Sequence, residues 1–342
     1  MVKLYYLMVT ILVIFSCSHK TDISAEPQVM SDTIPGTPGY VWTQVLPFGS
    51  GSFPEEWKQG TFPLGLGPVQ AFDSNLWMSW NKYAWSSSDG IKWDLHNKTD
   101  WGERISISIV YFKNKMWMTG GMRYKERKFM NDIWSTTDGK TWTNVGNAAW
   151  SPRKGQTVVV FKDKLWLFGG STGVLSNYNP TNFLNDVWSS DDGIQWKLVT
   201  NRTPWSPSEY PMVVVFNDMM YMVGGYMKSG IWKSADGINW EQLDAETDWQ
   251  PRTDYGALVY DQKLWVFGGR DTSANHTTAA KNDVWYSTDG AHWTMQKEHA
   301  AWTVRSGATS IVFKDKIWIF SGKHTGGEHN WGGDIWTMGK LY

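Results

Sequence analysis

A twelve-residue motif recurs along this chain and constrains its fold more than any other feature. Residues 185–196 read NDVWSSDDGIQW, and near copies read NDIWSTTDGKTW and NDVWYSTDGAHW. The first tryptophan of the motif occurs six times, at Trp85, Trp134, Trp188, Trp232, Trp285 and Trp336. The second also occurs six times, at Trp42, Trp93, Trp142, Trp196, Trp240 and Trp293. Because self-similarity at a fixed period is typical of packed supersecondary units, the sequence predicts six such units.

Each unit contains four short runs that favour β-strands, here named strands a to d in chain order. In the third unit they are residues 157–161 (TVVVF), 164–170 (KLWLFGG), 186–190 (DVWSS) and 195–199 (QWKLV). The Asp-Gly pair between c and d indicates a hairpin, because glycine supplies the positive φ that such turns require. A four-stranded unit cannot bury both faces alone, so the units are expected to pack around an axis. The predicted fold is all-β, a six-bladed β-propeller over residues 40–342.

The two ends of this segment are predicted to share the last blade. The sixth unit ends with DIWTMGKLY, which supplies strand c and leaves no residues for strand d. The stretch YVWTQVL, residues 40–46, is similar to TWTNVG of the second unit. We therefore expect residues 40–46 to supply the outer strand of blade six, which removes a free sheet edge.

The order of hydrophobic strand, paired glycines, spaced aromatic and second tryptophan resembles the kelch repeat over residues 40–338. The paired glycines are Gly120-Gly121, Gly169-Gly170, Gly224-Gly225 and Gly268-Gly269. The resemblance implies a galactose oxidase-like propeller and says little about activity. Copper oxidases of this kind need a cysteine crosslinked to a tyrosine, and the single cysteine here is Cys17. We therefore expect neither copper chemistry nor any other cofactor.

The N-terminus has the pattern of an export signal. Lys3 precedes a short apolar run over residues 5–15, which is too short to span a bilayer. The residues before Cys17 resemble a bacterial lipobox, so residues 1–17 are interpreted as a lipoprotein signal peptide with Cys17 lipidated; the alternative is an ordinary cleaved signal. Residues 18–39 are polar and contain prolines, and they are expected to form a flexible tether. The predicted location is the bacterial envelope, at the outer membrane, with contact through lipid alone.

Charge excludes one class of partner, and three tryptophans stand outside the repeat. The net charge of -1 gives no overall basic field, so no nucleic-acid partner is expected. Of the 25 tryptophans, Trp57, Trp80 and Trp331 fit no slot of the repeat. They belong to the b–c loop face of blades one and six, which are neighbours in a closed ring.

Polar residues in the same loops are His324, Glu328 and His329. Flat rings cover the apolar faces of sugars while polar groups bind the hydroxyls, so the set resembles a site for a carbohydrate or another small ligand, including an acidic one. The alternative is that the rings fill an irregular junction. The spacing of His324, Glu328 and His329 fits no helix-based zinc motif, and no metal is predicted.

Arginine and aspartate occur together in four units. Arg104, Arg153, Arg252 and Arg305 stand at the start of strand a, and Asp132, Asp186, Asp283 and Asp334 start strand c of the same units. One interpretation is a cationic ring at the mouth of the central channel, suited to carboxylate or sulfate. The other is an ion pair within each blade, spanning the glycine end of strand b and fastening the b–c loop. The shared presence and absence of Arg and Asp favours the ion pair.

Candidates for catalysis follow the arginine position. Glu209 and Tyr210 in blade four and Asp254 in blade five are expected to line the channel, where a pair of carboxylates can do acid–base chemistry on a sugar. The architecture resembles that of the sialic acid mutarotases, which are also six-bladed kelch proteins, without a shared active-site motif. The Asp-box pattern of residues 189–196, known from sialidases, is interpreted as a structural turn.

Three functions are therefore carried forward: a carbohydrate-binding module on the b–c loop face, a sugar-processing enzyme of mutarotase type, and a protein-interaction platform. A basic stretch at Arg123, Lys125, Arg127 and Lys128 is typical of a solvated loop, with contact to an acidic glycan as the second interpretation.

Overall fold

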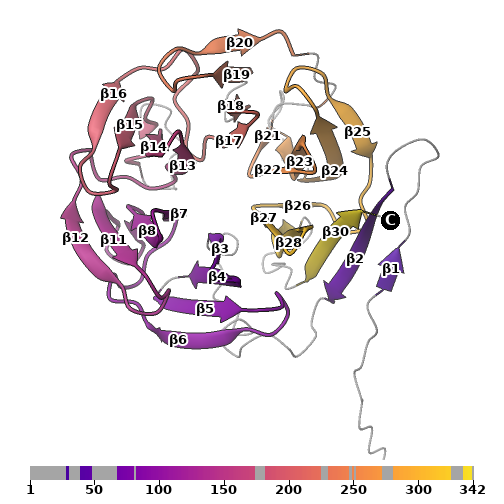
Figure 1. Cartoon of the computed structure of the whole chain (residues 1–342), viewed down its shortest axis with the longest axis horizontal. Coiled ribbons are helices and arrows are strands. Elements are labelled where there is room, and N and C mark those ends of the chain that lie inside the picture. Colours follow the sequence, from indigo (N-terminus) through magenta and orange to yellow (C-terminus); the bar gives the residue numbers. More distant parts are fainter. Residues whose placement is uncertain are drawn as a thin grey trace, which may run out of the picture.

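In the computed structural model, β-strands surround a common axis in six blades (Figure 1). The structure describes residues 28–30, 39–47, 68–80, 82–173, 182–224, 230–245, 249, 252–271, 280–324 and 334–340. Within each blade the four strands pair antiparallel in the order a, b, c, d from the axis outward. The inner strands contact one another in the sequence β3, β7, β13, β17, β22, β27 and back to β3. The prediction of a closed six-bladed propeller is confirmed.

The strands of the first three blades have the following bounds. Blade one consists of β3 (Val69–Phe72), β4 (Asn75–Trp80), β5 (Tyr83–Ser87) and β6 (Asp94–Lys98). Blade two consists of β7 (Ser108–Phe112), β8 (Lys115–Thr119), β11 (Asp132–Thr136) and β12 (Thr143–Asn147). Blade three consists of β13 (Thr157–Phe161), β14 (Lys164–Phe168), β15 (Val187–Ser190) and β16 (Lys197–Thr200).

The other three blades repeat this pattern. Blade four consists of β17 (Val213–Phe216), β18 (Met219–Val223), β19 (Ile231–Ser234) and β20 (Glu241–Leu243). Blade five consists of β22 (Gly256–Tyr260), β23 (Lys263–Asp271), β24 (Ala280–Ser287) and β25 (Thr294–Lys297). Blade six consists of β27 (Thr309–Phe313), β28 (Lys316–Phe320), β30 (Ile335–Lys340) and β2 (Tyr40–Leu46).

Short strands extend the blades on the b–c loop side and at the rim. β9 (Met122–Arg123) and β10 (Lys128–Phe129) form a hairpin on blade two. β21 (Arg252–Thr253), β26 (Arg305–Ser306) and β29 (Lys323–His324) join the sheet of blade five. β1 (Gln28–Met30) pairs with β2 as a fifth strand of blade six. Residues 28–30 belong to the segment 18–39 that was predicted to be a flexible tether, and the tether stays a prediction.

The two ends of the propeller segment meet in blade six, as predicted. β2 runs antiparallel to β30, with Tyr40 opposite Lys340 and Trp42 opposite Met338. Trp42 is fully buried, and its ring lies 4.1 Å from that of Trp302 in an edge-on arrangement. Because a buried indole contributes a few kcal/mol, roughly 2–3, this packing stabilises the closed ring.

The Asp-box turn joins each of blades one to five to the preceding blade. Asp192 Oδ1 accepts hydrogen bonds from the backbone N–H groups of Ile194 and Gln195, at 2.8 Å each. Gly193 lies so close to Trp117 of the preceding blade that an added Cβ would come within 2.8 Å of its ring. The same relation links Gly90 to Trp318, Gly139 to Trp77, Gly237 to Trp166 and Gly290 to Tyr221. The turn is therefore a packing element between blades.

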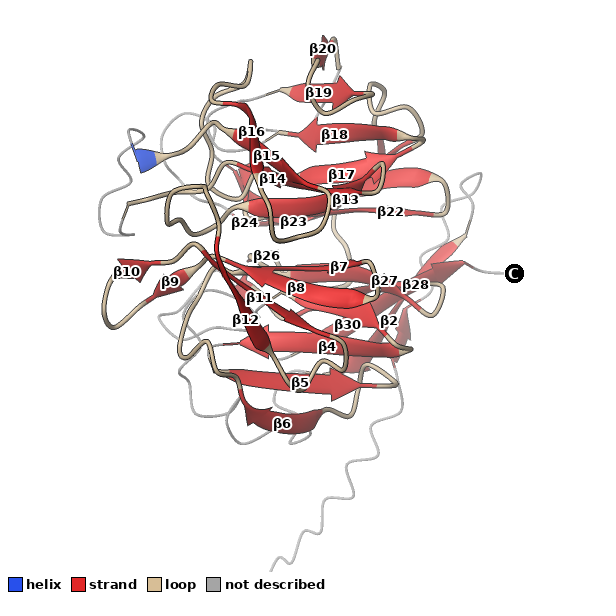
Figure 2. Cartoon of the chain, turned by 60° about the vertical axis from the view of Figure 1, so that its left-hand side comes forward, coloured by secondary structure: helices blue, strands red, loops and turns tan. Residues whose placement is uncertain are grey.

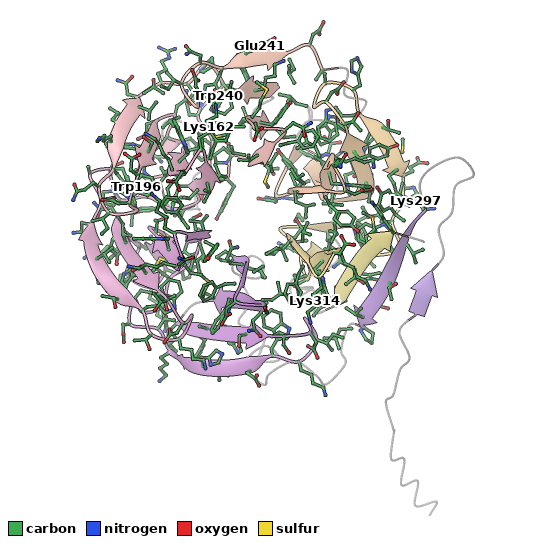
Figure 3. The ribbon with its side chains drawn as sticks, in the orientation of Figure 1. Lys162, Trp196, Trp240, Glu241, Lys297 and Lys314 are labelled. Atoms are coloured by element: carbon green, nitrogen blue, oxygen red, sulfur yellow. The ribbon has the colours of Figure 1, made fainter. Side chains whose placement is uncertain are left out.

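The start of strand d differs from the prediction because of this turn. Strand d of blade three was expected to include Gln195 and Trp196, but β16 begins at Lys197. The backbone N–H of Gln195 donates to Asp192, and the indole N–H of Trp196 donates to Gly193 O at 3.2 Å. Both residues therefore belong to the turn. Trp196 and its counterpart Trp240, labelled in Figure 3, come from blades three and four.

Blade six has no such turn, and Tyr40 takes its place against blade five. The ring of Tyr40 lies 5.0 Å from that of Trp265, edge to face. Its hydroxyl donates to Asp261 Oδ2 at 2.5 Å, and Lys340 forms an ion pair with Asp261 as well. One carboxylate of blade five thus binds residues of both strands that close the ring.

Candidate functional site

The four predicted ion pairs within blades are present. In blade three, Arg153 Nη1 and Nη2 donate to the two carboxylate oxygens of Asp186 at 2.6 and 2.7 Å. The Nη1 group also donates to Gly169 O at 2.9 Å, and the side chain of Arg153 is 0% exposed. The equivalent pairs are Arg104–Asp132, Arg252–Asp283 and Arg305–Asp334. These guanidinium groups are buried inside the blades, so they do not form an exposed cationic ring.

Two of these aspartates, Asp132 and Asp283, have a lowered pKa. Burial raises the pKa of Asp132, but hydrogen bonds from Arg104 and from the indole of Trp134 outweigh it, and the pKa lies below its usual value. Burial also raises the pKa of Asp283, but the hydrogen bond and the charge of Arg252 outweigh it, and this pKa too lies below its usual value. The pairs therefore act as fixed struts between the start of strand a and the start of strand c.

The glycines at the end of strand b have a further role in this arrangement. Gly169 has a φ of 55°, which turns its carbonyl oxygen toward Arg153. An added Cβ would lie 2.7 Å from Ser208 O of the next blade. The arginines themselves precede the inner strands; Arg153 lies four residues before β13 begins at Thr157. Glycine is thus required by backbone conformation and by a close contact between blades.

A ring of left-handed residues surrounds the axis on this face, two positions after the arginine position. Their φ values are 58° at Ser106, 62° at Gly155, 53° at Tyr210, 54° at Asp254 and 67° at Gly307. The N–H of Gly155 donates to Ser106 O at 3.0 Å, and that of Tyr210 donates to Gly155 O at 2.6 Å. The N–H of Gly307 donates to Asp254 O at 2.7 Å. This conformation therefore links blades around the axis, on the side of the b–c loops.

A buried ion pair joins blades three and four inside this ring. Lys154 Nζ contacts Glu209 Oε1, and the two side chains are 1% and 9% exposed. Burial raises the pKa of Glu209; the charge of Lys154 opposes this shift and that of Asp254 adds to it. Gly155 makes room for the pair, since a Cβ there would lie 2.5 Å from Glu209 Cγ. Glu209 is consequently a buried carboxyl group with a raised pKa that contacts the amine of Lys154.

Tyr210 and Asp254 complete a polar cluster that spans four blades. The hydroxyl of Tyr210 lies 2.5 Å from Ser106 Oγ of blade two, although Tyr210 belongs to blade four. The side chain therefore crosses blade three, where Gly155 has no side chain, and it is 44% exposed. Asp254 forms an ion pair with Arg270 of the same blade. We call Ser106, Lys154, Glu209, Tyr210, Asp254 and Arg270 the axial cluster.

The aromatic site predicted from the sequence is described only in part. Trp80 ends β4 opposite Tyr83, and His324 lies in β29 opposite Arg305. Both backbone positions are on the b–c loop side, as expected. Trp57, Trp331, Glu328 and His329 lie outside the described residues, as does Cys17. The predicted meeting of the three tryptophans thus stays a prediction.

The part of the chain that the structure describes contains no group of three or more His, Cys, Asp or Glu side chains arranged to hold a metal ion. No helix in these described segments has the length and apolar character needed to cross a membrane.

Sequence reasoning named Glu209, Tyr210 and Asp254 but missed their partners. Lys154 follows Arg153, and Glu209 follows Ser208, which occupies the arginine position of blade four. The two residues therefore share a repeat position in neighbouring blades and have opposite charges, and this pattern could have predicted the ion pair. Ser106 occupies the same repeat position as Tyr210 and Asp254. The contact of Ser106 with Tyr210 skips one blade, which no pattern of adjacent repeats indicates.

Comparison with known proteins supports the fold. Residues 136–252 match a family described as DUF6242 beta propeller domain, over less than half of the chain. The structure is similar to a solved structure described as "Structure of YjhT", with a TM-score of 0.63 and 14% sequence identity, covering 80% of this chain and 94% of that chain. No curated protein matches the chain. At this identity the likeness concerns the fold alone, which is that of a six-bladed β-propeller.

Proposed function

We propose that this chain is a kelch-type propeller of the bacterial envelope that binds a carbohydrate on its b–c loop face. The observation that carries the proposal is the axial cluster, which combines a partly exposed tyrosine with a Lys–Glu pair and an Arg–Asp pair from neighbouring blades. Sugar sites combine a flat apolar surface with a few positioned polar groups, and the cluster has both. The backbone positions of Trp80 and His324 are on the same face.

A glycan array with the wild type and two variants tests this proposal. Tyr210→Phe removes only the hydroxyl that reaches Ser106, and Asp254→Asn removes only the charge that faces Arg270. We expect each variant to melt near the wild-type temperature and to lose glycan binding about tenfold, the effect of about one lost polar contact to a charged group. Binding of no glycan by the wild type, together with capture of a specific protein, would favour the third function, a protein-interaction platform.

A second candidate is an enzyme acting on a sugar, and the raised pKa of Glu209 beside Lys154 favours it. A carboxyl group with a raised pKa is a candidate for general acid or base catalysis. The architecture resembles that of the sialic acid mutarotases, so the test reaction is interconversion of the anomers of sialic acid, followed by NMR. Accelerated exchange that is lost in Glu209→Gln would support catalysis, and an unchanged rate in the variant would exclude this role for Glu209.

Export and lipid anchoring through Cys17 are part of the proposal. The residues before Cys17 resemble a lipobox, and lipid is proposed as the only membrane contact. Cys17→Ala is expected to release the protein from the membrane fraction and to prevent labelling with a radioactive fatty acid. Retention of the variant in washed membranes would contradict the anchor.

A further inference from the structure

The hairpin of β9 and β10 is the b–c connection of blade two, and Figure 2 shows it extending beyond the strands of that blade. Its base is firmly held. Backbone hydrogen bonds join Ile105 and Met122 in both directions, at 3.0 and 2.9 Å, and the N–H of Arg153 donates to Met130 O at 2.9 Å. Met122 is 1% exposed. The hairpin therefore presents its tip, residues 124–128, from a rigid support.

Two features of this tip cost stability in the isolated protein. Arg123 and Lys128 are directly opposite each other in the β9–β10 pair, where like charges repel. Arg127 has a φ of 51°, in the left-handed region where glycine or asparagine is usual. A neutral residue at position 123 or 128 would remove the first cost, and glycine at position 127 would remove the second. Conflicts of this kind between sequence and local structure are typical of functional sites.

The positive charge at the tip is only partly neutralised. Glu103 binds both Lys125 and Lys82, at 2.8 and 3.0 Å, and Arg123 lies 3.6 Å from Glu126. Counting these residues together with Arg127 and Lys128, five cations face two carboxylates. In the described part of the chain neither Arg127 nor Lys128 has an ion-pair partner, and both are exposed. An anionic ligand would relieve the repulsion and pair these groups.

An aromatic ring stands among these cations. Tyr124 is 56% exposed, and the N–H of Arg127 donates to its carbonyl oxygen at 3.3 Å, which closes the turn. We propose that the hairpin binds an acidic polysaccharide, with Tyr124 stacking on a sugar ring and Arg127 and Lys128 binding its carboxylate or sulfate groups. This proposal rests on the proposed carbohydrate-binding function and adds the class of ligand.

Charge and surface character favour this partner over other polyanions. The net charge of the chain is -1, so attraction to an anion is local to the hairpin and does not extend over a long duplex or membrane. A membrane surface also requires several apolar side chains at the point of contact. Between residues 124 and 128 the tyrosine is the only aromatic or aliphatic side chain. A polysaccharide with spaced acidic groups matches one ring flanked by cations.

The test compares two double variants of the whole protein. Arg127→Ser with Lys128→Ser removes the unpaired cations of the hairpin. Lys162→Ser with Lys314→Ser is the matched control, because both lysines are exposed, both have a φ of 48°, and both lie in a–b turns, at the ends of the strands away from the b–c loops. Figure 3 labels both lysines. Thermal melting checks that both variants fold.

Binding is measured to polygalacturonate, dextran sulfate and neutral dextran over a series of salt concentrations. We expect the hairpin variant to bind the two acidic polymers about tenfold more weakly, with a smaller dependence on salt, and the control to bind as the wild type does. Equal weakening in both variants, or equal binding of dextran and dextran sulfate by the wild type, would overturn the proposal. Binding to phosphatidylglycerol vesicles is measured in parallel, and weaker binding of the hairpin variant to these vesicles alone would also overturn the proposal.

The outcome also separates this proposal from the wider one. If Tyr210→Phe weakens binding to all polysaccharides while the hairpin variant binds like the wild type, the axial cluster is the binding site and the role of the hairpin is refuted. If the wild type binds no polysaccharide, both proposals are refuted.

Discussion

Removing the guanidinium group of Arg153 measures how strongly the buried ion pairs hold a blade together. In Arg153→Leu the carboxylate of Asp186 loses hydrogen bonds of 2.6 and 2.7 Å, and Gly169 O loses one of 2.9 Å. Asp186 keeps only the indole of Trp188 as a side-chain donor among those described. Breaking a buried pair from one side costs about 3–5 kcal/mol, because the remaining charge is left uncompensated. Since the side chain of Asp186 is 16% exposed, we expect about 3 kcal/mol.

The assay is urea unfolding followed by tryptophan fluorescence, for Arg153→Leu, Asp186→Leu and the double variant. A coupling energy of about 2 kcal/mol between the two changes is expected, since the double variant leaves no unpaired charge. The control is the exposed pair Lys113–Asp163, whose atoms lie 3.1 Å apart with side chains 47% and 79% exposed. Substituting Lys113 is expected to cost less than about 1 kcal/mol. Equal costs for Arg153→Leu and Lys113→Leu would refute the reasoning.

Three further predictions concern the turns and the closure of the ring. Gly193→Ala should destabilise more than Gly102→Ala, because both have positive φ but only Gly193 lies against a neighbouring ring; equal loss in urea unfolding would contradict this. A hydrogen bond from the backbone of Asn239 contributes most to lowering the pKa of Asp236 to about 2, so this stabilisation is complete above the ordinary pKa near 4 and is lost as the pH falls toward 2. In Asp236→Asn, melting temperatures between pH 5 and pH 2 should fall less steeply than in the wild type. Asp261→Asn should lower the melting temperature by weakening the closure of blade six, by about 1–2 kcal/mol, and an unchanged temperature would show that closure does not depend on this carboxylate.

The repeat made the fold predictable, because each repeat position that recurs in this sequence has the same structural role in every blade where it occurs. The joint occurrence of Arg153 with Asp186, and of three similar pairs, was enough to predict the ion pairs, since a charge inside a sheet needs a partner. The hydrogen-bond partner of the Tyr210 hydroxyl, Ser106, was not predictable from the sequence. Ser106 lies 104 positions earlier in the sequence. It belongs to blade two, two blades before Tyr210, and the two residues meet only because the blades are arranged around a common axis.

The proposed binding surface was the least predictable part, because it lies where the repeat is broken. The irregular tryptophans could be assigned to a face from strand direction alone. Their mutual distances depend on connections that follow no period, and Trp57 and Trp331 fall outside the described residues. Likewise β1 was hidden in a polar segment, because Gln28–Met30 pairs through its backbone at a sheet edge and needs no hydrophobic pattern to do so.

Blade four shows how the loss of an ion pair makes room for a site. Ser208 stands where four other blades have arginine, and Gly230 stands where they have aspartate. The hydroxyl of Ser208 donates to Glu209 O at 3.1 Å, so this short side chain bonds to the next residue and does not reach strand c. Glu209 then pairs with Lys154 of blade three, and Tyr210 reaches blade two. In blades two, three, five and six the arginine ties the chain to its own sheet, whereas in blade four the same segment is tied to neighbouring blades. A change at Ser208 should consequently alter the axial cluster more than the stability of blade four.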